Sequence, residues 1–206
     1  MLGAGAANGA AVNGTNYSLD SLTHKPISLS NGTAVTSGGV IQIGSFNSTG
    51  AALDALIAGL TSPAGLNALL ADFIAFGSTT TVGGQGAGFE GIYDLPAQAP
   101  LAAGNPLVGK SIYTLIGNNA SLAASTDLAI VQDNAAFDVD APLFNTAASL
   151  LEGTNVYRFG NGSGPSLTAN SVFPAAASLQ LSPIPEPMSA ALLLSGLALV
   201  VRRRRA

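Results

Sequence analysis

The stretch VGKSIYTLI, residues 108–116, is the best strand candidate of the chain. Its aromatic and β-branched side chains favour strands because they pack well on a pleated surface, so we predict a strand over residues 107–116. Residues 40–46 alternate well enough to predict a half-buried strand, bounded by Gly38 with Gly39 and by Gly44. Further strand candidates lie at residues 79–82, 89–95, 127–132 (DLAIVQ), 155–159 (NVYRF) and 178–181 (SLQL).

Turn residues separate these strand candidates, notably Gly117-Asn118-Asn119 and Gly160-Asn161-Gly162. About six to nine short strands at this spacing, with no alternation of strands and helices, indicate a mainly β fold. We expect the body, residues 35–181, to be an antiparallel β-sandwich or jelly roll.

A helical hairpin is predicted inside this body, over about residues 50–77. Leucine and isoleucine recur at helical spacing in its first half, at Leu53, Leu56, Ile57 and Leu60. Ser62 is placed to cap a second helix that has Pro63 at its first position. The same period continues through Phe73 and Ile74, and we expect Gly77 to end this helix.

The amino-acid composition limits the kinds of molecule that this protein can be expected to bind. Charged residues make up 9% of the chain, against about 25% in an average soluble domain. Before the tail that begins at residue 182, only Lys25, Lys110 and Arg158 are basic, against ten acidic residues. This negative balance excludes nucleic acid as an expected partner. The chain has no cysteine, which excludes disulfides and thiolate metal sites.

Residues 1–34 are rich in Gly, Ala, Asn, Ser and Thr, and we expect an irregular segment with one or two short strands. The first twenty residues contain no Lys or Arg and no apolar run of the kind a secretory leader has. We therefore expect the natural gene product to start further upstream, or its start codon to have been assigned too late. Export without a leader is the alternative.

Residues 182–206 form a tail of three physically different parts. The prolines of Pro185-Glu186-Pro187 predict an exposed, polyproline-like strip over residues 182–187. Residues 188–201 are uncharged and predict a short transmembrane helix of ~21 Å, against about 30 Å of hydrocarbon. Its anchoring side chains are Met188, Leu192, Leu193, Leu194, Leu197, Leu199, Val200 and Val201.

Four consecutive arginines, Arg202, Arg203, Arg204 and Arg205, follow this helix. Each arginine costs about 2.5 to 3.5 kcal/mol at the membrane centre, whereas each leucine or valine gains only roughly 0.3 to 0.6 kcal/mol. The arginines are therefore expected to stay at the cytoplasmic headgroups. This orientation places everything before Pro185 outside.

In this order of parts the tail resembles the PEP-CTERM sorting signal of Gram-negative bacterial surface proteins, which is also described as an ice-binding protein C-terminal domain. The resemblance covers about a tenth of the chain. It implies processing by exosortase, a membrane-embedded transpeptidase, with Pro185, Glu186 and Pro187 as the recognition element. It further implies passage through the inner membrane, a final place at the cell surface or outside the cell, and exopolysaccharide as a candidate neighbour.

The acids Asp133, Asp138 and Asp140, with Asn134, supply oxygen atoms of the kind that Ca²⁺ prefers. Their spacing lacks the Asp-x-Asp-x-Asp-Gly order of a calcium loop. We therefore interpret them as a solvated strand face and predict no metal.

Other candidates for chemistry are equally weak. His24 is the single histidine and is expected at the surface, without a triad or a metal site. Glu90 and Asp94 would lie about 13 Å apart on one strand, beyond the roughly 5 to 9.5 Å of glycosidase pairs. The glycines in residues 83–88 precede a strand candidate, which favours a plain connection over a phosphate loop. No catalytic residue and no cofactor are predicted.

These observations predict a non-enzymatic, exported protein of the cell surface or extracellular matrix whose tail is a sorting signal. Two alternatives remain for the β body. One is a secreted enzyme that acts on polysaccharide, and the other is a module that binds carbohydrate or Ca²⁺.

Overall fold

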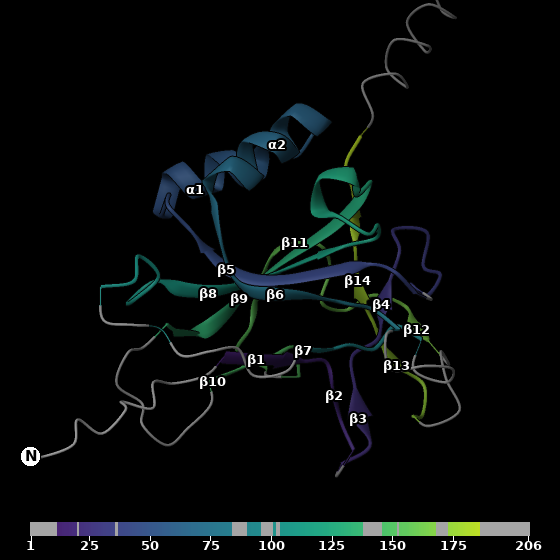
Figure 1. Ribbon diagram of the computed structural model, residues 1–206. Helices are drawn as coiled ribbons and strands as arrows, with labels where there is room; N and C mark the ends of the chain where they lie inside the picture. The colour runs from purple at the N-terminus through teal and green to yellow at the C-terminus, as the bar shows by residue number, and fades with distance from the viewer. Residues whose placement is uncertain are drawn as a thin grey trace, which may run out of the picture.

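The computed structural model describes residues 12–19, 21–35, 37–83, 90–95, 101, 104–137, 146–151, 153–167 and 173–185. Within these residues the fold is mainly β, with several antiparallel sheets and the two α-helices of the predicted hairpin (Figure 1). The largest sheet has the strand order β11-β9-β8-β5-β6, and β15 pairs with β9 as well. Its strands are β5 (Val40–Phe46), β6 (Phe73–Thr81), β8 (Ser111–Gly117), β9 (Asp127–Ala136), β11 (Val156–Phe159) and β15 (Ser182–Pro183).

All strands of this central sheet pair antiparallel to their neighbours. Strand β8 lies in the middle, where Ile116 pairs with Ile41 of β5 and with Ala129 of β9. The strand predicted over residues 107–116 is therefore present, but it begins only at Ser111. Residues 107–110 form a turn instead, in which the Lys110 N–H donates to the Leu107 carbonyl oxygen at 2.9 Å.

The central sheet is apolar on both faces, with the period of two expected of strands. One face packs against the helices through Phe46, Tyr113, Leu115, Leu128 and Ile130. The opposite face carries Ile41, Ile43, Ile112, Ile116 and Val131, which pack against the small sheets. Figure 1 shows the central sheet between the helices and the layer formed by β1, β7 and β10.

This two-sided packing corrects the prediction for residues 40–46. The strand was expected to be half-buried and to end at Gly44, but all seven residues of β5 are buried. Gly44 lies inside the strand, where an added Cβ would come too close to the Ile74 carbonyl oxygen and the aromatic ring of Phe73 in β6. A side chain there would take the place of that ring.

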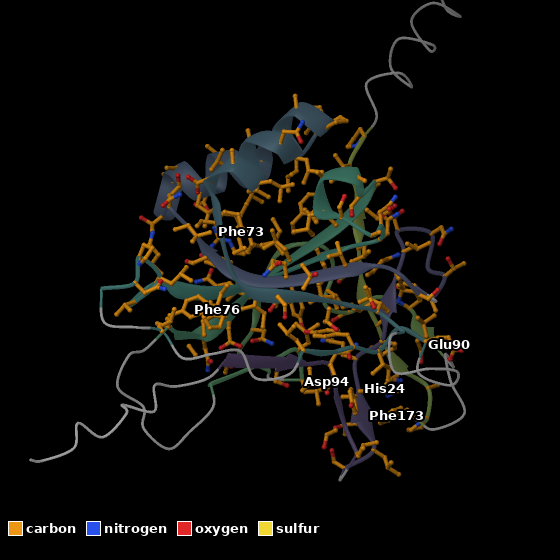
Figure 2. The ribbon with its side chains drawn as sticks, viewed as in Figure 1. His24, Phe73, Phe76, Glu90, Asp94 and Phe173 are labelled. Carbon is orange, nitrogen blue, oxygen red and sulfur yellow. The ribbon has the colours of Figure 1, made fainter. Side chains whose placement is uncertain are left out.

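The helical hairpin consists of α1 (Gly50–Ala58) and α2 (Pro63–Asp72). Ser62 caps α2 as predicted, because its Oγ accepts a hydrogen bond from the Gly65 N–H at 3.2 Å. The helix ends at Asp72, however, and not at Gly77. Strand pairing overrides the helical period here, since Phe73 pairs with Phe46 of β5 and the following residues continue β6. Figure 2 shows Phe73 on the helix side of the central sheet and Phe76 on the opposite side.

The remaining strands are short and form small sheets below the central one. Strand β1 (Val12–Thr15) lies between β10 (Thr146–Ser149), which is parallel to it, and β7 (Asp94–Leu95). The other pairs are β2 (Tyr17–Ser18) with β3 (Thr23–His24), β4 (Ile27–Ser28) with β14 (Leu179–Gln180), and β12 (Ser166–Leu167) with β13 (Ala176–Ala177). A 3₁₀ helix, η1 (Leu122–Ala124), lies between β8 and β9.

Two predictions need correction in these small sheets. The described part of residues 1–34 contains four short strands, where one or two were expected. The strand candidate over residues 89–95 is reduced to β7, because residues 90–91 form a turn and Gly91 takes a positive φ of 73°. The Gly91 carbonyl accepts the Ile27 N–H at 3.0 Å, so this turn serves as a partner for β4.

None of the helices in the described residues is both long and apolar enough to cross a membrane. The predicted transmembrane helix, residues 188–201, and the arginines that follow it lie outside the described residues.

The close contact at Gly44 can be tested by substitution. A Cβ at this position would lie 2.5 Å from the Phe73 Cζ, so Gly44→Ala should lower the free energy of unfolding by about 1–3 kcal/mol. The control is Gly153→Ala, because a Cβ at Gly153 meets nothing within 4 Å. Urea unfolding of both variants measures the difference, and equal midpoints would show that the packing at β5 and β6 is described wrongly.

Candidate functional site

The predicted tail leaves the body at β15, on the edge of the central sheet. Ser182 pairs with Leu128 and Pro183 pairs with Asp127, at the start of β9. The Ile184 N–H then donates to the Thr126 carbonyl oxygen at 2.7 Å. The Ile184 side chain is only 4% exposed and packs in the core beneath the helices. The chain is therefore held in place up to Ile184.

Pro185, the first residue of the predicted recognition element, is exposed directly after this anchored residue. Glu186, Pro187 and the rest of the tail lie outside the described residues. Residues 182–184 had been predicted as part of an exposed strip. Pro183 is exposed as predicted, but Ser182 is only partly exposed and Ile184 is buried. Their backbone completes the edge of β9, and the apolar side chain of Ile184 gains more from the core than from water.

A network of polar side chains positions the Thr126 carbonyl, which is the hydrogen-bond partner of the Ile184 N–H. The Asn118 Oδ1 accepts the N–H groups of Thr126 at 3.0 Å and of Asp127 at 3.1 Å. The Asp127 carboxylate in turn accepts the Ser30 N–H at 3.2 Å and the Asn118 Nδ2–H at 3.2 Å. These bonds fix the turn before β9, which presents the Thr126 carbonyl to the exit of the chain.

Asp133 and Asn134 are the predicted cation ligands within the described residues, since Asp138 and Asp140 lie outside them. Asn134 is exposed, as expected of a solvated face, but Asp133 is not, because it is only 7% exposed. One carboxylate oxygen accepts the Ala135 N–H at 2.8 Å. Burial raises the pKa of Asp133, and the hydrogen bonds from the backbone oppose that shift. The described residues include no group of three or more acidic or histidine side chains suited to a metal.

Tyr93 is a second buried polar group, and it belongs to the core on the face of the sheet away from the helices. It is fully buried, and its Oη has no hydrogen-bond partner among the described residues. Burial raises the pKa of Tyr93, and the negative charge of Asp133 adds to this effect. The hydroxyl therefore stays protonated and is not a nucleophile at neutral pH.

His24 was expected at the surface but is only 6% exposed. Its ring packs on Phe173, with centroids 4.8 Å apart, and Figure 2 shows the two side chains together. Neither ring nitrogen bonds to a described residue, and burial lowers the pKa of His24. A neutral, packed imidazole explains the position better than a triad or a metal site would.

Glu90 and Asp94 do not lie on one strand. Glu90 is in the turn before Gly91, while Asp94 begins β7, and Figure 2 shows them at separate places. The strand separation estimated from the sequence therefore does not apply to them. Residues 84–88 of the glycine-rich stretch lie outside the described residues.

Comparison with known proteins adds no family to this description. No protein-family model, no curated protein and no solved structure matches the chain. The resemblance of the tail to a sorting signal stays a prediction from its residues.

The buried Asp133 predicts a specific dependence of stability on pH. Because folding raises the pKa of Asp133, protonation of this carboxyl stabilises the folded state. That stabilisation is fully present below the ordinary pKa of 3.8 and is lost as the pH rises through the pKa of Asp133 in the folded protein. Asp133→Asn should therefore raise the thermal unfolding midpoint at pH 7, and the gain should disappear below about pH 3.8. Asp54→Asn, at an exposed position on α1, removes one charge together with an exposed ion pair to Arg158, which contributes little to stability, and serves as the control. A lower midpoint for Asp133→Asn at pH 7 would contradict this account.

The anchor at Ile184 predicts where the chain is protected. Ile184→Ala removes a buried side chain, at a cost of about 2–5 kcal/mol where the surrounding core cannot relax. We expect the loss to appear as local release of β15, which exposes residues 182–185 to limited proteolysis. Ser182→Ala keeps the backbone pairing and is the control. Equal cleavage of both variants at this segment would show that Ile184 does not hold the chain.

Proposed function

We propose that the chain is an exported, non-enzymatic protein of the cell surface or extracellular matrix of a Gram-negative bacterium. Its tail would be a sorting signal processed by an exosortase-type transpeptidase of the inner membrane. The proposal rests on the order of the tail: Pro185-Glu186-Pro187, an apolar segment and four arginines. The observation that supports it best is the exposure of Pro185 next to the anchored Ile184.

The boundary between the anchored Ile184 and the exposed Pro185 lies where a processing enzyme could bind the chain. A protease or transpeptidase binds its substrate in an extended form, and residues paired in a sheet are not free to enter such a site. Residues 182–184 are held by β9 and by the Thr126 carbonyl, so they are protected. Recognition would begin at Pro185, the first residue with an exposed side chain and no place in the sheet.

The same boundary would keep the body close to the membrane. Three residues, 185–187, separate Ile184 from the expected transmembrane helix, and they span at most ~11 Å when extended. The exit lies on the helix side of the central sheet, where Ile184 packs in the same core as Leu122 of η1 (Figure 1). In the membrane-bound intermediate, that side of the body would face the bilayer.

We also infer that the body is a mainly antiparallel β-sandwich in which the central sheet and the layer of β1, β7 and β10 are the two β layers, with β1 and β10 as a parallel pair. The α1–α2 hairpin is then an insertion that covers the outer face of the central sheet. Residues 188–201 would form the short transmembrane helix, with Arg202 to Arg205 on the cytoplasmic side.

The experiment replaces Pro185, Glu186 and Pro187 by alanine in the native host. We expect the full-length chain to accumulate in the inner membrane, because the recognition element is gone while the anchor remains. Fractionation and immunoblotting measure the amount and the size of the product. Pro183→Ala, just before the element, is the matched control and should be processed normally. Release of a mature product from the alanine variant at the normal rate would refute the proposal.

A further inference from the structure

A hollow of about 160 Å³ lies where β5 ends and β8 begins. It has room for several water molecules, each of which takes about 30 Å³ in the liquid. Its walls come from the connection between β5 and α1 and from the turn before β8. The lining residues are Ser45, Phe46, Ser48, Thr49, Gly109, Lys110, Ser111 and Tyr113. Hydroxyl groups and one cation therefore surround this space.

Lys110 supplies the positive charge of the hollow. Its Nζ donates to the Phe46 carbonyl oxygen at 2.9 Å, which uses one of the three ammonium hydrogens. The other two described cations have polar side-chain partners, since Arg158 pairs with Asp54 and the Lys25 Nζ donates to the Tyr157 hydroxyl. Within the described residues, Lys110 has no carboxylate partner. Its charge is available to a ligand in the hollow.

Ser45 also lines the hollow, and it is only 2% exposed. Its Oγ is not among the buried polar side-chain atoms of the described residues that lack a hydrogen-bond partner. A serine hydroxyl can both donate and accept a hydrogen bond. Ser45 therefore adds one more hydroxyl-bearing residue to the walls of the hollow.

The start of α1 borders the same space. Thr49 is its N-cap residue, and its side chain makes no capping hydrogen bond. The first amides of α1 thus keep their partial positive charge near the rim. Asp72 contacts the rim, because its carboxylate oxygens accept the N–H and the Oγ–H of Ser48, both at 2.9 Å. These two hydrogen bonds hold the carboxylate against Ser48.

We propose that this hollow binds the carboxylate of an acidic sugar, with Lys110 as the ion-pair partner and the hydroxyl of Ser45 as a hydrogen-bond partner. A singly charged group is favoured over phosphate because the hollow has one lysine and the chain has a net charge of −4. A sugar fits because Thr49, Ser111 and Tyr113 also line the hollow and carry hydroxyls that can donate and accept. The hydroxyl of Ser48, a further lining residue, donates to Asp72. The site is independent of the proposed sorting of the tail.

The test is titration calorimetry of the full chain, in a neutral detergent, with sodium glucuronate as the probe. We expect saturable binding of glucuronate and none of glucose, which lacks the carboxylate. Lys110→Met should weaken binding about tenfold or more, and Lys110→Arg should restore part of it. Ser45→Ala, which removes no charge, should weaken binding by about two- to tenfold.

Lys25→Met is the matched control, because it removes the same charge at a site outside the hollow. It should leave glucuronate affinity unchanged. Equal weakening by Lys25→Met and Lys110→Met would overturn the proposal, since only the overall charge would then matter. The absence of saturable glucuronate binding to the unmodified chain would overturn it as well. Sulfate that binds as tightly as glucuronate would overturn the assignment to a sugar.

Discussion

The antiparallel pairing of β8 with β5 and β9 holds the other parts of the molecule in place. These three strands are apolar on both faces, so each face needs a cover that excludes water. The α1–α2 hairpin covers one face and the small sheets cover the other. The start of β9 also receives β15, and the end of β5 forms the hollow with the turn before β8. The exit of the tail and the proposed sugar site are thus both fixed by the same three strands.

A chain without cysteine and with few charges depends on this core and on well-paired buried polar groups. Asn16 is fully buried, and it donates to the carbonyls of Lys25 and Gly91 and accepts the Tyr93 N–H. It therefore joins the first strands to the turn before β7. Gln42 does the same between β5 and β6, through the Phe76 carbonyl. Asp133, unlike these two amides, is a buried polar group that burial disfavours, because burial raises its pKa and so opposes its ionisation.

The sequence indicated the mainly β fold, the helical hairpin and the Ser62 cap, because these depend on local patterns. It placed the boundaries of β5, α2 and β8 wrongly, since pairing between distant strands decides them. Burial of His24 and Asp133 was missed for the same reason: no local pattern reveals that Phe173 covers His24. The burial of Ile184 was not predicted because the residue lies between Pro183 and Pro185, although its apolar side chain favours burial. Lys110 and Ser45 meet only through the pairing of β5 with β8.

The central claim is that the body ends at Ile184 and that the tail is removed just beyond it. The intact mass of the mature protein, isolated from the cell surface or the culture medium of the native host, tests this claim most directly. The account predicts a mass that lacks the apolar segment and the arginines, with a new C-terminus at or shortly after Pro185. A mature chain recovered from the cytosol with Ala206 still in place would contradict it.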